Sequence, residues 1–189
     1  MNFILIAGPP AVGKMTVGQA LSKRLGYPLF HNHHSIELTL DLFAWGTPEF
    51  KKINSGIREL VFNTAAQSEN ITGFIFTLVI AFDLEEDLEE VRRINRTFQE
   101  QGARSILVEL YALLDTRLER NQTPNRLAHK PSKRKLELSE ENLRRMEQKY
   151  SLNSEGSPLT EMEHLRVDNT ELSADEVAAQ IVEHFRLEG

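Results

Sequence analysis

The residues from Gly8 to Thr16 carry the clearest chemical signal in the sequence. They read Gly-Pro-Pro-Ala-Val-Gly-Lys-Met-Thr, a Gly-x-x-x-x-Gly-Lys pattern. Glycines allow the chain to turn sharply, and the successive backbone N–H groups of such a turn form a concave anion site. A lysine at this position reaches the β- and γ-phosphates of a nucleotide as a point charge. The pattern therefore predicts a phosphate-binding loop with Lys14 as a catalytic and phosphate-binding residue.

The position after Lys14 departs from the strict pattern of such loops. A Ser or Thr is expected there as a ligand of Mg²⁺, but Met15 occupies the position and Thr16 carries the nearest hydroxyl. We predict that Thr16 lies on the Mg²⁺ side of the site, because charged phosphate oxygens need a hard ligand nearby. The alternative is a hydroxyl in the first helical turn that bonds only to backbone.

The elements that flank the loop are those that a phosphate site requires. Residues 2–7 are apolar and predict a buried strand, and the apolar positions from Val17 to Leu25 keep helical spacing up to Gly26. A helix that begins at the loop adds the partial positive charge of its N-terminus to the site. This context makes a chance match to the loop pattern the weaker interpretation.

Strands and helices alternate along the rest of the chain. This order predicts an α/β three-layer sandwich with a parallel sheet and right-handed crossovers. Ligands of such folds bind at the carboxyl ends of the strands. Further strands are expected at 27–31, 72–82, 104–112 and 165–168, and further helices at 35–45, 48–69, 83–102, 139–150 and 174–185.

Composition narrows the class of protein. A chain of 189 residues with 40% hydrophobic residues predicts one domain over 1–189 with an ordinary core. The net charge of −6 argues against nucleic-acid and anionic-membrane partners. Cysteine is absent, which excludes disulfides and thiolate chemistry. With no secretory signal and no membrane span in view, we expect a cytoplasmic protein, either a monomer or a homodimer.

The histidines after the second strand are candidates for the acceptor side of the site. His33 can accept a hydroxyl proton or bind a substrate oxygen. The alternative is that His31, Asn32 and His33 only satisfy a helix start, with Asn32 or Ser35 as the cap. A metal site at His31 and His33 is weaker, because no other ligand cluster accompanies them. The helix expected at 35–45 is apolar nearly all round, which predicts burial or a pocket wall.

Two carboxylates are ambiguous. Asp83 follows the third strand and is a candidate ligand on the Mg²⁺ side, but Asp83 with Glu86 also matches a helix N-cap. Glu109 is a charge inside an otherwise apolar strand and must be paired or protonated there. It is either a site residue or half of a structural ion pair.

Residues 121–138 are polar and basic within an acidic chain. Arg117, Arg120 and Arg126 lead into this segment, and a guanidinium can clamp phosphate or stack on adenine. We expect at least one of the three to be functional. The remaining charges are expected to form a solvated run: Lys130, Lys133, Arg134 and Lys135.

With these features the chain resembles the small P-loop kinases, which include nucleoside monophosphate, shikimate and gluconate kinases and chloramphenicol phosphotransferase-like enzymes. Pro10 and the displaced Thr16 are similar to the Gly-x-Pro-x-x-Gly-Lys-Gly-Thr loop of the monophosphate kinases. The resemblance implies sheet order 2-3-1-4-5, ATP and Mg²⁺ as cofactors, and a mobile lid at 121–138. It implies catalytic roles for Arg117 and Arg126 and nucleotide contacts from a larger set: Gly8, Pro10, Ala11, Val12, Gly13, Lys14, Met15, Thr16, Arg117, Arg120, Asp168 and Asn169.

The acceptor side departs from that family. Where many members carry an Asp after the second strand, this chain has His31–His34, and it lacks the Asp-Gly-Phe-Pro-Arg of monophosphate kinases. A nucleoside monophosphate acceptor is therefore disfavoured. The sequence predicts an ATP-dependent phosphotransferase for a small hydroxylated or phosphorylated metabolite. The alternatives are a nucleotide-binding module and an NTPase switch.

Overall fold

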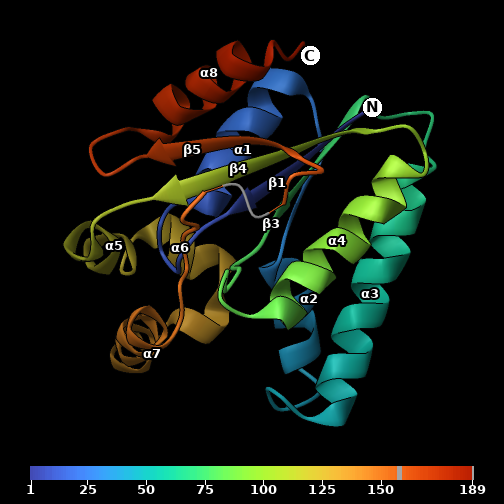
Figure 1. The fold of residues 1–189 in the computed structure, drawn as a ribbon. Coiled ribbons are helices and arrows are strands. Elements are labelled where there is room, and N and C mark those ends of the chain that lie inside the picture. Colours follow the sequence, from blue (N-terminus) through green and yellow to red (C-terminus); the bar gives the residue numbers. More distant parts are fainter. Residues whose placement is uncertain (157–158, 189) are drawn as a thin grey trace.

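The computed structural model describes residues 1–156 and 159–188. At its centre β1 pairs with β3 and β4, β3 with β2, and β4 with β5, all in parallel. The order β2-β3-β1-β4-β5 confirms the predicted five-stranded sheet (Figure 1). The strands are β1 (Asn2–Ala7), β2 (Leu29–His31), β3 (Gly73–Thr77), β4 (Arg104–Tyr111) and β5 (Glu163–Asp168).

Helices cover both faces of this sheet. They are α1 (Lys14–Leu25), α2 (His33–Leu40), α3 (Pro48–Ala66), α4 (Glu85–Gln99), α5 (Leu114–Arg120), α6 (Pro124–His129), α7 (Leu136–Lys149) and α8 (Ala174–Phe185), with a 3-10 turn η1 (Pro131–Lys133). Alternate residues of β1 face opposite sides, so Ile4 packs under α1 and α8, whereas Phe3 packs under α3 and α4 (Figure 1). This arrangement confirms the three-layer sandwich.

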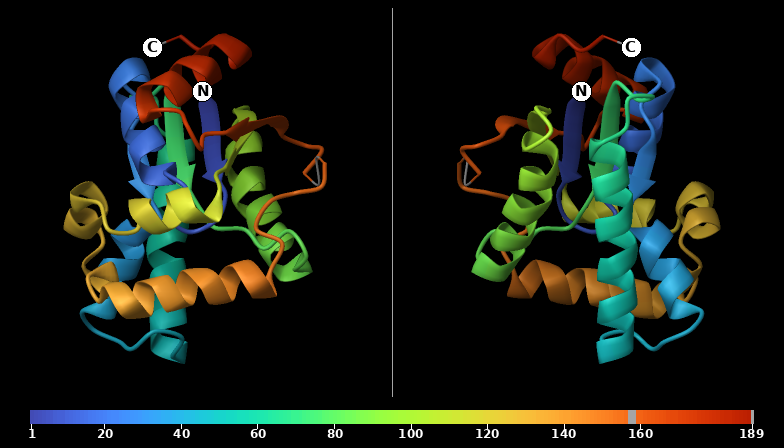
Figure 2. Two further views of the ribbon diagram at one scale, coloured as in Figure 1. Left: turned by 90° about the vertical axis from the view of Figure 1, so that its left-hand side faces the viewer. Right: turned by 90° about the vertical axis from the view of Figure 1, so that its right-hand side faces the viewer.

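The helix termini follow their local sequence signals. Thr47 Oγ1 accepts a hydrogen bond from Phe50 N–H at the start of α3, and Ser173 with Glu176 forms a capping box on α8. Gly26 ends α1 with a φ of +70°. Beyond the carboxyl ends of the strands lie α5, α6, α7 and α2, as the side views show (Figure 2). These elements therefore enclose the edge of the sheet at which a ligand is expected.

The helix predicted at 35–45 is shorter and more exposed than expected. It begins at His33, has no side-chain cap and ends at Leu40. Leu38, Leu42 and Trp45 are 56%, 66% and 68% exposed, so the prediction of a buried helix was wrong. Among the described elements, α2 packs chiefly on α3 and η1, which leaves these three side chains exposed.

Three other boundaries also differ from the prediction. β3 ends at Thr77 instead of continuing to residue 82, and residues 78–82 are not part of a strand. α4 begins at Glu85 with Leu84 at its N-cap, so Asp83 does not cap it. α7 begins at Leu136, and Ser139 lies inside the helix with its hydroxyl donating to Asn121 Oδ1. No helix in the described part of the chain is both long and apolar enough to cross a bilayer.

Candidate active site

The loop between β1 and α1 has a backbone that favours small residues. The φ angles of Gly8, Ala11 and Gly13 are +135°, +62° and +112°. A side chain at position 8 would meet the backbone carbonyl of Leu110 on β4, so glycine is required there for space as well as for conformation. α1 starts directly after Gly13, and its first N–H groups are open to a ligand. The predicted strand–loop–helix arrangement is confirmed.

Lys14 folds back into this loop. Its Nζ donates to the backbone carbonyls of Gly8 and Pro9, at 2.6 and 2.8 Å, and the residue is only 7% exposed. Burial, and then the charges of Lys130 and Arg126, hold the pKa of Lys14 well below its usual range. An anion would supply the counter-charge that this buried ammonium lacks, so the loop is electrostatically suited to phosphate.

Arg120, at the end of α5, and Asn169, after β5, brace the loop. Asn169 Nδ2 donates to the Val12 carbonyl at 2.9 Å, and Arg120 Nη1 donates to the same oxygen at 3.0 Å. Arg120 Nη2 also donates to the carbonyls of Asn169 and Thr170. The Arg120 guanidinium thus bonds to backbone carbonyls and braces the loop. A nucleotide contact was predicted for Arg120, and this bracing contact was not.

Asp168 forms its hydrogen bonds with Thr170, two residues further along the chain. Its Oδ1 accepts hydrogen bonds from Thr170 N–H and Thr170 Oγ1, at 2.9 and 2.6 Å. These hydrogen bonds lower the pKa of the Asp168 carboxyl, which lies at the exposed end of β5. Its nucleotide role stays a prediction.

A cavity of about 340 Å³ opens beside the loop, within the size range of small-ligand sites. Its wall is formed by the loop, the start of α1, α6 and the turn before α8. The residues are Ala11, Gly13, Lys14, Met15, Thr16, Val17, Arg120, Thr123, Asn125, Arg126, Lys130, Asn169, Leu172, Ser173 and Ala174. The structure therefore brings predicted nucleotide contacts from three separate segments to one cavity.

The two residues predicted on the Mg²⁺ side lie apart. Thr16 is exposed at the cavity, with its Oγ1 3.5 Å from Asn125 Nδ2. Asp83 lies in a separate hollow near Asn153, where its Oδ1 accepts a hydrogen bond from Ser151 N–H at 2.9 Å. The structure thus places Thr16, but not Asp83, in the wall of the phosphate cavity. Within the described residues, no three His, Asp or Glu side chains form a metal-binding group.

Of the other predicted arginines, Arg117 is buried and Arg126 is half-buried. Arg117 is 2% exposed; its Nε donates to the Ala112 carbonyl and its Nη2 pairs with Glu147 at 2.6 Å. Its Nη1 is buried and has no partner among the described residues. Arg126 Nε donates to Asn121 Oδ1, and burial lowers the pKa of Arg126 to about 10. Arg126 lines the cavity and Arg117 does not, but the charge of each lowers the pKa of Lys14.

Lys130 is the residue that sequence reasoning missed. It was expected in a solvated run, but it is 8% exposed and lines the cavity. Burial, and then the charges of Arg126 and Lys133, lower the pKa of Lys130 to about 7. Its charge also lowers the pKa values of Lys14 and His33, so Lys130 lies between the loop and the histidines. Nothing in the basic run distinguished it from its neighbours.

The acceptor-side histidines are buried at the end of β2. His31 is 3% exposed, its ring stacks on His34 at 3.6 Å, and neither ring nitrogen has a partner among the described residues. Burial lowers its pKa to about 3. Burial also lowers the pKa of His33 to about 4, although the hydrogen bond to Glu37 opposes this shift. These rings are therefore neutral at pH 7 and can accept protons.

Two charged residues beside the histidines were not singled out by the sequence. Arg58 of α3 donates to Ser35 Oγ and to the Asn32 carbonyl, and burial lowers its pKa. Glu37 Oε1 lies 2.7 Å from His33 Nδ1. Its position four residues after His33 on one helix was a usable signal, because such residues share a helix face.

Glu109 belongs to a structural network. It is fully buried and accepts hydrogen bonds from Asn153, Ser154 and His164. Burial would raise the pKa of Glu109, but these hydrogen bonds hold it at about 2. The network therefore joins β4 to β5 and to the loop before it, as the structural alternative predicted.

The Glu109→Gln variant is expected to unfold more easily. A folded pKa of about 2, against 4.5 in the free side chain, is worth about 3 kcal/mol. This stability is present above pH 4.5 and is lost as the pH falls towards 2. Urea unfolding at pH 7 should show a loss of about 2–3 kcal/mol. The exposed Glu59→Gln variant is the control, and equal stability of the two variants would contradict the assignment.

Comparison with known proteins finds matches among solved structures only, since no family model and no curated protein matches the chain. A shikimate kinase from Acinetobacter baumannii, in complex with shikimate, aligns with a TM-score of 0.59 at 20% identity, over 98% of this chain and 93% of that one. A gluconokinase from Sinorhizobium meliloti aligns with a TM-score of 0.53 at 16% identity, over 98% and 95%.

The tunicamycin resistance protein of Deinococcus radiodurans aligns with a TM-score of 0.56 at 17% identity, over 99% of this chain and 97% of that one. The chain has the fold of the small P-loop kinases. The likeness covers nearly the whole chain, which includes the five-stranded sheet. The resemblance read from the loop sequence is thus confirmed as a fold.

Proposed function

We propose that the protein is an ATP-dependent phosphotransferase that acts on a small hydroxylated or phosphorylated metabolite. The observation that carries this proposal is the setting of Lys14. Its buried ammonium lies in a glycine-bounded loop and, among the described residues, bonds only to backbone carbonyls. It is repelled by Lys130, Arg126 and Arg117. Four cations converge where polyphosphate charge would neutralise them.

The donor half of the site suits the phosphates of ATP. The loop N–H groups and Lys14 would bind the β- and γ-phosphates, and the unpartnered Arg117 Nη1 and the half-buried Arg126 would complete the clamp. Thr16 is the residue present that would hold Mg²⁺, which neutralises charge on phosphate oxygens when bound. These side chains would position the transferring group and stabilise its charge, with little covalent work.

The acceptor half centres on His33. The acceptor hydroxyl would lie against His33, whose neutral ring can take its proton. Lys130 in the cavity wall and Arg58 beside Ser35 and Asn32 place positive charge near this half of the site, which favours an acceptor that carries an anionic group. His31 offers two further ring nitrogens for substrate oxygens.

Residues 121–138 would act as the lid of a single domain over 1–189. The segment contacts the rest of the site at both ends: Asn125 Nδ2 donates to Gln19 of α1, and Ser132 donates to Glu37 of α2. Closure of such a segment excludes water from the transferring phosphoryl group.

Measurement of ATP consumption with and without a panel of small hydroxylated acceptors tests the proposal. Stimulation by one class of acceptor is the expected result, with anionic acceptors favoured over neutral ones. Hydrolysis that no acceptor changes would identify an NTPase instead, and ATP binding without turnover would identify a binding module.

A further inference from the structure

One carboxylate joins the acceptor-side histidine to the lid. Glu37 Oε1 lies 2.7 Å from His33 Nδ1, and Ser132 Oγ donates to the same oxygen at 2.6 Å. The other oxygen, Oε2, accepts a hydrogen bond from Ser132 N–H at 3.0 Å. Ser132 belongs to η1 and is 95 residues away in the sequence. The Glu37 side chain is 19% exposed, so these contacts are partly shielded from water.

The protonation states follow from this geometry. Burial would raise the pKa of Glu37, but the hydrogen bonds from His33 and Ser132 hold it at about 2, so Glu37 is a carboxylate at neutral pH. An ionised carboxylate can only accept hydrogen bonds, and a neutral imidazole has one N–H. Nδ1 must therefore carry the proton of His33. The lone pair of its ring is then on Nε2, the nitrogen that faces away from Glu37.

We propose that Glu37 is a positioning residue that holds His33 as a base through Nε2 and couples this state to closure of the lid. The inference rests on the proposed function. In the reaction the acceptor oxygen bonds to the γ-phosphorus and its proton passes to His33 Nε2. The bond from the γ-phosphorus to the bridging oxygen breaks, and ADP leaves with that electron pair.

The same contact controls the cationic side of the site. Lys130 lies two residues before Ser132, so the bonds from Ser132 to Glu37 hold Lys130 in the cavity. The other charged groups near this pair are Lys133 of η1, whose charge lowers the pKa of His33, and Arg58 of α3, which donates to Ser35 Oγ and to the Asn32 carbonyl. Ser132 leaves Glu37 when the lid opens, and the base and Lys130 then lose their shared anchor. Transfer to an acceptor is thereby favoured over transfer to water.

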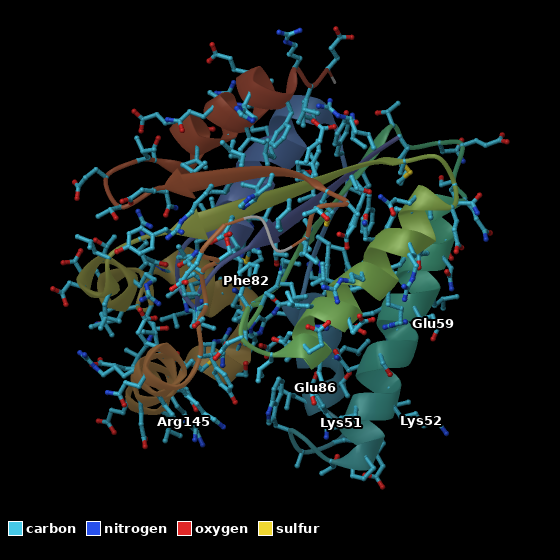
Figure 3. The ribbon with its side chains drawn as sticks, viewed as in Figure 1. Lys51, Lys52, Glu59, Phe82, Glu86 and Arg145 are labelled. Atoms are coloured by element: carbon cyan, nitrogen blue, oxygen red, sulfur yellow. The ribbon has the colours of Figure 1, made fainter. Side chains whose placement is uncertain are left out.

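The tautomer of His33 can be measured without any assay of activity. Nitrogen-15 chemical shifts of the histidine rings, with His33 assigned from the signal that a His33→Asn variant lacks, should show Nδ1–H in the wild type. Glu37→Ala should move His33 towards the Nε2–H form, whereas the exposed Glu59→Ala variant should not. Glu59 extends from α3, away from the lid, and provides the matched control (Figure 3).

Rates of transfer test the catalytic half of the inference. Glu37→Ala should lower kcat at least tenfold with a smaller change in acceptor KM, and Glu37→Gln should shift the acid limb of the kcat profile to lower pH. Ser132→Ala keeps the pair of Glu37 and His33, so the His33 tautomer should be unchanged while transfer falls severalfold.

An unchanged tautomer or wild-type transfer in Glu37→Ala would overturn the inference and leave the proposed function standing. Wild-type transfer in Ser132→Ala would overturn the coupling to the lid. Absence of acceptor-dependent transfer by the wild-type chain would overturn the proposed function and the catalytic half of the inference together. In that case the tautomer measurement still tests whether Glu37 keeps the proton of His33 on Nδ1.

Discussion

The Lys14→Ala variant is expected to lose phosphoryl transfer by on the order of a thousandfold, because it removes the charge aimed at the developing negative charge on the transferring group. The alanine side chain leaves a cavity that bulk water can enter, and water does not replace a preorganised ammonium. The loss should appear mainly in kcat, since the loop N–H groups and Arg126 still bind the phosphates.

The fold of this variant should be retained. The depressed pKa of Lys14 means that folding disfavours its charged form, so removal of the charge relieves a cost that is present at neutral pH. The two hydrogen bonds to loop carbonyls that are lost are worth about 1 kcal/mol each. Lys52→Ala, on the exposed side of α3, is the matched control (Figure 3). Undiminished transfer by Lys14→Ala, measured beside it, would contradict the assignment.

The Lys130→Ala variant is expected to lose transfer by about a hundredfold, the effect of removing one preorganised charge from the cavity. Lys130 lines the cavity, and its charge lowers the pKa values of both Lys14 and His33. Lys135→Ala removes an exposed charge from the same basic run and is the control. Equal rates for these two variants would show that the run acts only as a solvated surface.

The lowered pKa of Lys130 predicts a second measurable effect, which is proton uptake when ATP binds. At pH 8 a lysine with a pKa of about 7 is mostly neutral in the free protein. Bound phosphates raise this pKa, so ATP binding at pH 8 should take up protons. Calorimetric titration in two buffers of different ionisation enthalpy measures the uptake. It should decrease in Lys130→Ala, and equal uptake in the wild type and the variant would contradict the proposed position of Lys130.

Local signals in the sequence predicted the strand–loop–helix unit of the phosphate loop and several helix ends. These signals are the apolar strand before Gly8, the glycine that ends α1, and the capping box at Ser173. The order of the strands followed from the resemblance to a family and not from the local signals. Asn169 was predicted on the same ground, and the structure adds its hydrogen bond to the Val12 carbonyl.

The acceptor half depended on long-range contacts that no local pattern encodes. Lys130 and Lys133 look alike in the sequence, and only the docking of η1 on α2 separates a cavity residue from its neighbours. Trp45 is an aromatic residue of the type that fills cores, but it lies in the turn between α2 and α3, contacts Phe50 and is 68% exposed. Asp83 satisfied the pattern of a cap, and the start of α4 at Glu85 placed it outside the helix.

The most direct test of the account follows the γ-phosphate itself. The wild-type chain is incubated with ATP labelled at the γ-phosphorus, Mg²⁺ and the acceptor panel, and the products are separated. We expect the label in an organic phosphate ester of one class of acceptor, and no such product from Lys14→Ala. Label found only in inorganic phosphate, at a rate that no acceptor changes, would contradict the assignment of the protein as a phosphotransferase.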